Sequence, residues 1–261
     1  MTRLPVAPNR DLGQHFLVDE NILGVIGRLA ELDRADVVLE VGPGLGVLTR
    51  YLADRVGRVH AVELDAGLEP HLRERLEGRA NIDLVLGDAL RLDLGALTPA
   101  PTKLVSNLPY NVATPLVVES LTRLPSVRMW CVMVQREVAD RFFASPRTKA
   151  YGAVSVLLQL AADRTGFHAV SRTVFSPPPN VDSALVAFRR KPLPADFSRV
   201  KRVIEAAFAH RRKTIPNSLE LAGMTDRASA AAALDAVGRN ASTRAEELDP
   251  AEFVAFAAAL P

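Results

Sequence analysis

The chain has 261 residues, of which 48% are hydrophobic and 24% charged, with a formal net charge of +2. This composition excludes a disordered chain and a fibrous repeat, and the net charge alone does not indicate nucleic acid. No apolar run reaches the ~18 residues that a membrane span needs, and the N-terminus lacks the apolar core of a signal peptide, so we expect a cytoplasmic protein. With one cysteine, Cys131, no internal disulfide or cysteine-based zinc site is possible, and we expect no metal.

Five short β-branched runs alternate with longer helical patterns in the first half of the chain. They are VVLEV (37–41), RVHAVE (58–63), IDLVL (82–86), KLVSN (103–107) and VRMWCVMV (127–134). The segments between them are long enough for crossover helices, and this spacing predicts βαβ units. The sequence therefore predicts an α/β fold with a doubly wound, mostly parallel sheet.

The pattern changes toward the C-terminus. A helical stretch (151–163) precedes the runs FHAV (167–170) and SALVAF (183–188), which we expect to form an antiparallel edge pair. KPLPADF (191–197) has two prolines and predicts a linker. Apolar residues then recur at helical spacing, which predicts a small all-helical domain. We expect a catalytic domain over 1–190 and a helical domain over 195–261.

A glycine-rich turn, LEVGPGLGVLT (39–49), follows the first strand and leads into a helix. Glycines at 42, 44 and 46 allow positive φ and a close approach of ligand to backbone, so Gly42 and Gly44 are predicted to bind a cofactor. A dinucleotide-binding dehydrogenase needs G-x-G-x-x-G, and Val47 stands where its third glycine would be. The form E-x-G-x-G-x-G, with Glu40 two residues ahead, is typical of class I methyltransferases, which use S-adenosylmethionine.

The next two strands also end in acidic residues. Glu63 closes the second strand, where a carboxylate can accept both ribose hydroxyls of an adenosine. Asp88 follows the third strand in GDAL and can accept a hydrogen bond from an adenine amino group. Each position alone is more typical of a surface glutamate or a helix-capping aspartate, whereas their order on successive strand ends predicts a site for an adenosine-containing cofactor.

The fourth strand ends in SNLPY (106–110). Adenine N6 is a poor nucleophile because its lone pair is conjugated into the ring. The Asn107 amide oxygen and the Pro109 carbonyl can accept its N–H bonds and aim the lone pair at a methyl group. Tyr110 offers a flat face on which an extruded base can stack. Without this strand context, the tetrapeptide NLPY (107–110) would be more typical of a turn with Tyr110 in the core.

Nine segments in this order resemble the ribosomal RNA adenine dimethyltransferases. They are LGQHFLVD (12–19), LEVGPGLGVLT, AVELD (61–65), GDAL (87–90), SNLPYNVATPL (106–116), VQREVADRF (134–142), KAYGAVSVLLQ (149–159), VFSPPPNVDSALV (174–186) and AFAHRRKTIPNSL (207–219). The last two resemble the small-subunit enzymes, which dimethylate two adjacent adenines near the 3′ end of 16S rRNA and are linked to subunit assembly. Relatives that methylate 23S rRNA and confer macrolide resistance are the second interpretation.

The resemblance implies specific roles for site residues. Cofactor contacts would be His15, Leu17, Gly42, Glu63, Asp88 and Asn107, and target-base contacts would be Asn107, Leu108, Pro109 and Tyr110, with Phe175 as a second stacking aromatic. Two positions depart from the family. His15 replaces a common asparagine and is alternatively a capping or packed residue, and Pro216 stands where the family more often has a basic or polar residue.

Basic residues cluster between Arg189 and Lys213, with nine basic against two acidic residues in 25 positions. This run predicts a phosphate-facing patch in which Arg211, Arg212 and Lys213 bind RNA, although a solvated helix face with a linker has the same pattern. The expected partner is 16S rRNA in the small subunit or its precursor, and the expected state is a monomer.

Two further interpretations differ in chemistry. DNA adenine and protein-glutamine methyltransferases usually carry D-P-P-Y or N-P-P-Y where this chain has NLPY. A non-catalytic assembly factor would keep RNA binding and lose the chemistry, whereas NLPY is intact here.

Overall fold

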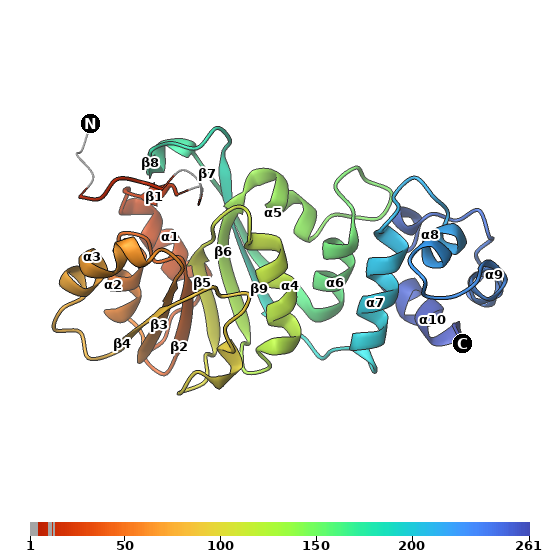
Figure 1. Cartoon of the computed structure of the whole chain (residues 1–261), viewed down its shortest axis with the longest axis horizontal. Coiled ribbons are helices and arrows are strands. Elements are labelled where there is room, and N and C mark those ends of the chain that lie inside the picture. Colours follow the sequence, from red (N-terminus) through yellow and green to blue (C-terminus); the bar gives the residue numbers. More distant parts are fainter. Residues whose placement is uncertain (1–4, 10–11, 13) are drawn as a thin grey trace. The chain divides into compact units, whose positions relative to one another are not determined.

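The computed structural model describes residues 5–9, 12 and 14–261, which divide into two compact units (Figure 1). The first unit contains the described residues up to 139 together with 164–190, and the second contains 140–163 and 191–261. The second unit thus begins a new segment at Lys191, close to the expected linker, and also includes 140–163. The reason is packing, because helix α6 (Ala153–Ala161) contacts α7 (Phe197–Phe208) and α10 (Pro250–Ala259) through a largely buried surface.

A seven-stranded sheet forms the centre of the first unit, in the order β4-β3-β2-β5-β6-β9-β7. Its strands are β2 (Val37–Val41), β3 (Arg58–Glu63), β4 (Ile82–Leu86), β5 (Lys103–Asn107), β6 (Met129–Gln135), β7 (Ala162–Val170) and β9 (Ser183–Arg190). The first five run parallel and β9 pairs antiparallel with β6. These strands and the doubly wound α/β fold confirm the sequence prediction.

Strand β7 is longer than the predicted run. It begins at Ala162, directly after α6, whereas the apolar run FHAV begins at Phe167. Along β7 only Ala162 and Val170 are buried, so its first half carries almost no hydrophobic pattern that a sequence could reveal. It lies beside β9 at the edge of the sheet, as the expected neighbour of SALVAF.

Helices cover both faces of the sheet (Figure 1). Alternate residues of β6 pack on opposite sides, as the period of a strand requires. Met129, Cys131 and Met133 join a core with helices α1 (Asn21–Leu29) and α2 (Val47–Ala53). On the other face, the Trp130 indole donates to Ser120 Oγ of helix α4 (Ala113–Arg123) at 2.8 Å. The carboxyl ends of β2, β3, β4 and β5 therefore meet at one edge, where open α/β sheets bind ligands.

Short elements border that edge. Strand β1 (Phe16–Leu17) pairs antiparallel with β8 (Phe175–Ser176), placing Leu17 opposite Phe175. Helix α3 (Glu69–Arg75) follows β3, and α5 (Arg136–Phe142) follows β6. The β1–β8 pair joins the N-terminal segment to a loop more than 150 residues later, which brings both beside the end of β5.

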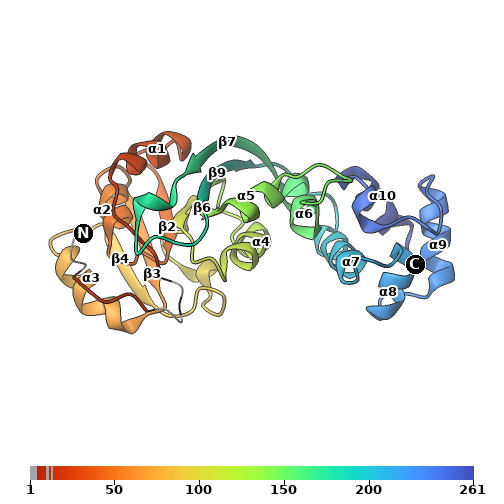
Figure 2. The same cartoon turned by 90° about the horizontal axis from the view of Figure 1, so that it is seen from above.

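The second unit is mainly helical (Figure 2). It contains α6, α7, α8 (Ile215–Leu221), α9 (Arg227–Ala236) and α10. The predicted apolar face of α7 is buried, and Asp196, Asp226 and Asp249 cap α7, α9 and α10 by accepting backbone N–H groups. Pro216 occupies the first turn of α8, where its missing N–H costs nothing, so the departure at this position has a structural role. No helix within the described part of the chain has the length and apolar character to cross a membrane.

Candidate active site

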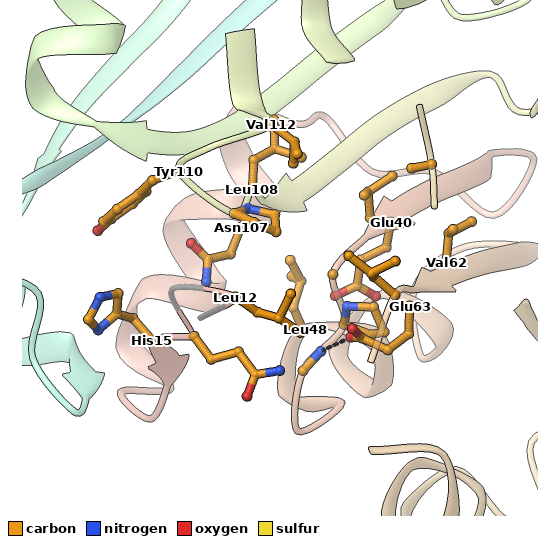
Figure 3. Close-up of a pocket in the computed structure, with 18 of the residues that line it drawn as sticks. Leu12, His15, Glu40, Leu48, Val62, Glu63, Asn107, Leu108, Tyr110 and Val112 are labelled. Carbon is orange, nitrogen blue, oxygen red and sulfur yellow. Dashed lines mark hydrogen bonds between the residues drawn. The ribbon is translucent and has the colours of Figure 1, made fainter. Parts of the chain in front are cut away.

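A pocket opens at the carboxyl ends of β2, β3, β4 and β5, inside the first unit (Figure 3). All the predicted cofactor and base residues line it: His15, Leu17, Gly42, Gly44, Glu63, Asp88, Asn107, Leu108, Pro109, Tyr110 and Phe175. The structure thus brings together residues that lie up to 160 positions apart in the sequence. The basic residues 211–213 belong to the other unit and are not among them.

The glycine turn after β2 has a backbone that other residues rarely adopt. Gly42, Gly44 and Gly46 have φ of +74°, +57° and +72°. A Cβ at Gly42 would lie 3.2 Å from the Pro109 ring, and one at Gly44 would lie 3.0 Å from the Phe16 ring. Glycine is required here both for the left-handed conformation and for the space between the turn and its neighbours.

Glu63 ends β3 and is nearly buried, with 5% of its surface exposed. Its carboxylate accepts the Gly44 N–H at 3.1 Å (drawn in Figure 3) and the Asp65 N–H at 2.9 Å. Burial raises the pKa of Glu63, while these two backbone bonds oppose the rise. The carboxylate therefore both fixes the glycine turn and presents remaining acceptor capacity to the pocket.

Glu40, on β2, is a second buried carboxyl in the pocket wall (Figure 3). Burial raises its pKa to about 8, the nearby Thr49 hydroxyl opposes this, and the charge of Glu63 adds to it. Its Oε2 has no hydrogen-bond partner among the described residues. An unsatisfied buried carboxyl oxygen is costly, so Glu40 is prepared for a cation or a donor entering the pocket.

Asp88 follows β4 and is partly exposed. Its Oδ1 accepts the Leu90 N–H at 2.9 Å, and its Oδ2 lies 3.3 Å from Arg91 Nε. Asp88 thus stabilises its own turn, which is the structural role that the sequence also allowed, and it lines the pocket as well. Both roles coexist because a carboxylate has about four acceptor sites.

Asn107, Leu108, Pro109 and Tyr110 form the end of the pocket away from Glu63. Figure 3 shows the Asn107 amide directed into the cavity, whereas Leu108 is buried and its N–H donates to the Met133 carbonyl at 3.0 Å. The Pro109 carbonyl accepts the Val112 N–H at 3.2 Å, which leaves it one lone pair. Tyr110 is partly buried, and burial raises the pKa of its phenol.

Leu17, Phe175 and His15 lie beside this end. Leu17 and Phe175 are 6% and 3% exposed and belong to the core that packs under α1 and α2. Phe175 therefore reaches the pocket with little of its ring, and a stacking role for it stays a prediction. The His15 ring lies 5.7 Å from that of Tyr110, centroid to centroid, and its Nδ1 is 2.8 Å from the Pro177 carbonyl.

Gln14 and Leu64 are among the pocket residues that were not predicted from the sequence. Gln14 donates to Asp65 at 2.8 Å and so connects the N-terminal segment to the loop after Glu63. Leu64 is 54% exposed although apolar, and it too lines the pocket. Two sequence features could have indicated these residues as part of the site. Gln14 directly precedes His15, and Leu64 is an apolar residue directly after Glu63, which ends a strand.

The family described as Ribosomal RNA adenine dimethylase matches residues 7–259. The chain belongs to this family. A Ribosomal RNA small subunit methyltransferase A from Rubrobacter xylanophilus is 47% identical over 250 residues, which cover 95% of this chain and 94% of that protein. Another from Kineococcus radiotolerans is 44% identical over 268 residues, covering 99% and 88%. The expected enzyme class, a methyltransferase of this family, is confirmed.

Solved structures agree with this fold. The 23S rRNA methyltransferase ErmE has a TM-score of 0.66 and 31% identity, over 94% of this chain and 99% of that one. A dimethyladenosine transferase from Plasmodium falciparum has a TM-score of 0.78 at 24% identity, over 93% and 96%, and supports the fold alone. The glycine turn and NLPY thus lie in a methyltransferase fold, and the dehydrogenase interpretation is left without support.

The basic run is divided between the two units, and its first two residues already have partners within the first unit. Arg189 and Arg190 belong to the first unit, and the others to the second. Arg189 pairs with Glu31 at 2.6 Å, and Arg190 donates to the carbonyls of Leu121, Leu124 and Val127. Arg190 thereby supplies donors to backbone carbonyls at the C-terminal end of α4. Net charge along the sequence gave no sign of these partners.

The three residues predicted to bind RNA differ in their surroundings. Arg211 donates to the backbone carbonyls of Tyr151 and Lys149 at 3.0 and 3.4 Å. Arg212 and Lys213 are exposed, and neither side chain has an ionic or hydrogen-bond partner within the described residues. Arg212 and Lys213 are therefore the members of this group whose charges are available to a ligand.

Proposed function

We propose that this chain transfers methyl groups from S-adenosylmethionine to N6 of two adjacent adenines near the 3′ end of 16S rRNA, in the small subunit or its precursor. The observation that carries the proposal is the convergence of Asn107 with two buried carboxyls, Glu40 and Glu63, in one pocket at the sheet edge. Dimethylation is the activity of the family to which the chain belongs.

The pocket fits the proposed cofactor. S-adenosylmethionine carries a sulfonium and an ammonium, and positive charge entering the pocket would favour the ionised form of the buried carboxyls Glu40 and Glu63, whose pKa values burial raises. The glycine turn has no side chains to fill the cavity at Gly42 and Gly44. Glu63 and Asp88 retain acceptor capacity for hydroxyl and amino groups. The cofactor supplies an electrophilic methyl group when it is bound.

The chain's own contribution at the other end is to orient the amine. The Asn107 amide oxygen and the free lone pair of the Pro109 carbonyl accept the two N6–H bonds, which turns the nitrogen lone pair toward the cofactor end. Methyl transfer would release the thioether form of the cofactor, and the methylated nitrogen would then lose one proton to solvent. One N–H remains, so a single acceptor holds the amine for the second transfer. The Tyr110 ring gives the base a face on which to stack.

The choice of 16S over 23S rRNA rests on the relatives. The proteins from Rubrobacter and Kineococcus that cover nearly the whole chain at 47% and 44% identity carry small-subunit names, whereas ErmE is 31% identical. We infer that exposed residues of the helical unit, Arg212 and Lys213 above all, contact phosphates of this RNA.

The test is methylation of purified 30S subunits that lack the modification, with isotope-labelled S-adenosylmethionine. We expect label in 16S rRNA and N6,N6-dimethyladenosine in the nuclease digest by mass spectrometry. Protein-free 23S rRNA and 50S subunits are the controls. Label in 23S rRNA alone would transfer the proposal to the large subunit, and binding to 30S without label would favour a non-catalytic assembly factor.

A further inference from the structure

Tyr110, at the base end of the pocket, contacts a serine to which sequence reasoning gave no role. Ser183, the first residue of β9, shares a hydrogen bond of 2.9 Å with the Tyr110 hydroxyl. Ser183 is 1% exposed, and its backbone position is set by pairing with Gln135 of β6. The phenol is therefore bonded to a strand of the sheet, at the first residue of β9, and not only attached to its own loop.

His15 contacts the ring of the same tyrosine. Its Nδ1 lies 2.8 Å from the Pro177 carbonyl, and because a carbonyl only accepts, Nδ1 must carry the hydrogen. The His15 and Tyr110 ring planes are tilted by 33° at a centroid distance of 5.7 Å, which is direct aromatic contact. That separation is too short for a base to enter between the two rings.

The backbone around His15 is fixed as well. Phe16 and Leu17 of β1 pair with Ser176 and Phe175 of β8. His15 and Pro177 are the next two residues of these antiparallel segments and lie opposite one another. Phe16 and Leu17 are buried. The imidazole is consequently held by the residues that precede β9, the strand that also carries Ser183.

We propose that Ser183 and His15 are positioning residues that hold the Tyr110 ring as a fixed platform for the target base, and that the His15 side chain serves the base rather than the cofactor. The inference rests on the proposed function, since it requires a base to stack on Tyr110. A tyrosine attached only by its own backbone can change rotamer, and a platform fixed in advance spares the base the entropy of ordering it.

A double-mutant cycle tests the role of Ser183. Ser183→Ala and Tyr110→Phe each remove the same hydrogen bond, and we expect each to lower kcat on 30S subunits about 2- to 12-fold with an unchanged Kd for S-adenosylmethionine. Because the same bond is absent from all three variants, the double variant should be no slower than the slower single variant. Losses that multiply would show that the two residues act independently and would overturn the proposal.

Stability is measured in parallel, since Ser183 is buried. Ser120→Ala is the matched control, because Ser120 is 2% exposed and its hydroxyl bonds Val117 and Trp130 away from the pocket. It should lower Tm and leave kcat unchanged. Ser183→Thr keeps the hydroxyl and should recover kcat relative to Ser183→Ala. A kcat that follows Tm across all these variants would reduce Ser183 to a structural residue.

His15→Asn separates the two possible roles of His15. The variant loses the ring contact with Tyr110, so we expect kcat to fall about 2- to 12-fold while calorimetric affinity for S-adenosylmethionine is unchanged. Weaker cofactor binding with an intact kcat at saturation would make His15 a cofactor residue and overturn its assignment. Wild-type methylation of 30S subunits is measured first, and its absence would count against the proposed function, separately from these comparisons.

Discussion

The two ends of the pocket are built in different ways. At the cofactor end, Gly42, Glu63 and Asp88 each follow or end a neighbouring parallel strand, so the sheet itself sets their spacing. At the base end, Tyr110 contacts His15 and Ser183, which come from distant parts of the chain. The first end depends on local backbone and the second on long-range contacts. Changes at the first should therefore alter cofactor binding, and changes at the second should alter turnover.

The largest effect that this comparison predicts is at Asn107. Asn107→Ala removes the acceptor that we propose orients the amine, and we expect kcat to fall on the order of 100-fold or more. Affinity for 30S subunits should stay near wild type, since one base contact is small beside many phosphate contacts. Single-turnover methylation and 30S binding measure the two. Asn21→Ala, at an exposed position on α1, is the control, and a weakened 30S affinity with normal chemistry would contradict the assignment.

Glu63→Ala should have its main effect at the opposite end. Hydrogen bonds to a charged group contribute roughly 1.5 to 3 kcal/mol, so affinity for S-adenosylmethionine should weaken roughly 10- to 150-fold. Loss of the bond to Gly44 also loosens the turn. Calorimetry gives the affinity, with Glu69→Ala, which removes only an exposed ion pair, as the control. Unchanged affinity would remove Glu63 from the cofactor site.

Glu40 should make the free energy of unfolding depend on pH. Its pKa is raised from 4.5 to about 8 by burial, so the folded chain holds a proton that the unfolded chain releases. The free energy of unfolding should fall as pH rises from about 4.5 to about 8, by at most about 1.4 kcal/mol per pH unit, and then level off. Below 4.5 both states are protonated and this dependence ends.

Glu40→Gln removes that titration, so its stability relative to wild type should increase with pH across this window. Chemical denaturation at several pH values and constant ionic strength measures the difference. Glu69→Gln, at a partly exposed residue whose carboxylate pairs with Arg73 at the surface, serves as the reference. Parallel pH profiles for wild type and Glu40→Gln would show that Glu40 is ionised in the folded chain.

The smallest effect is expected outside both ends. Replacing Arg212 and Lys213 with alanine should flatten the dependence of log K on log salt for 30S binding by about 0.7 to 0.9 for each phosphate that is no longer neutralised, with kcat at saturation retained. Arg211→Ala is the comparison, because Arg211 bonds Tyr151 and should affect stability instead. A wild-type slope in the double variant would move RNA binding elsewhere, to the basic residues near β6.

The cofactor end could be predicted from sequence because each of its parts is local. Buried parallel strands appear as β-branched runs, and the residue that ends each run is by geometry at the ligand edge. That is why Glu63 and Asp88 were placed correctly in the pocket. The functional roles of these residues stay predictions.

The base end and the basic run could not be predicted in the same way. No local pattern connects Ser183 with Tyr110, which lie 73 positions apart, because their contact depends on how β9 pairs with β6. Arg190 has the charge of a phosphate ligand, yet its donors bond two carbonyls at the end of α4 and that of Val127 in the following loop. Sequence gives the number of charges, whereas tertiary structure decides which of them are already engaged.

The division of the chain has a practical consequence for dissecting the protein. Residues 140–163 belong to the second unit, so a fragment that starts at the linker lacks α6. Buried α6 residues such as Val156 and Leu158 contribute to the surface against which α7 and α10 pack. A fragment without α6 would expose the apolar surfaces of α7 and α10 that α6 covers, and we expect it to aggregate. A faithful isolated unit requires both segments, for example joined by a short linker that replaces residues 164–190.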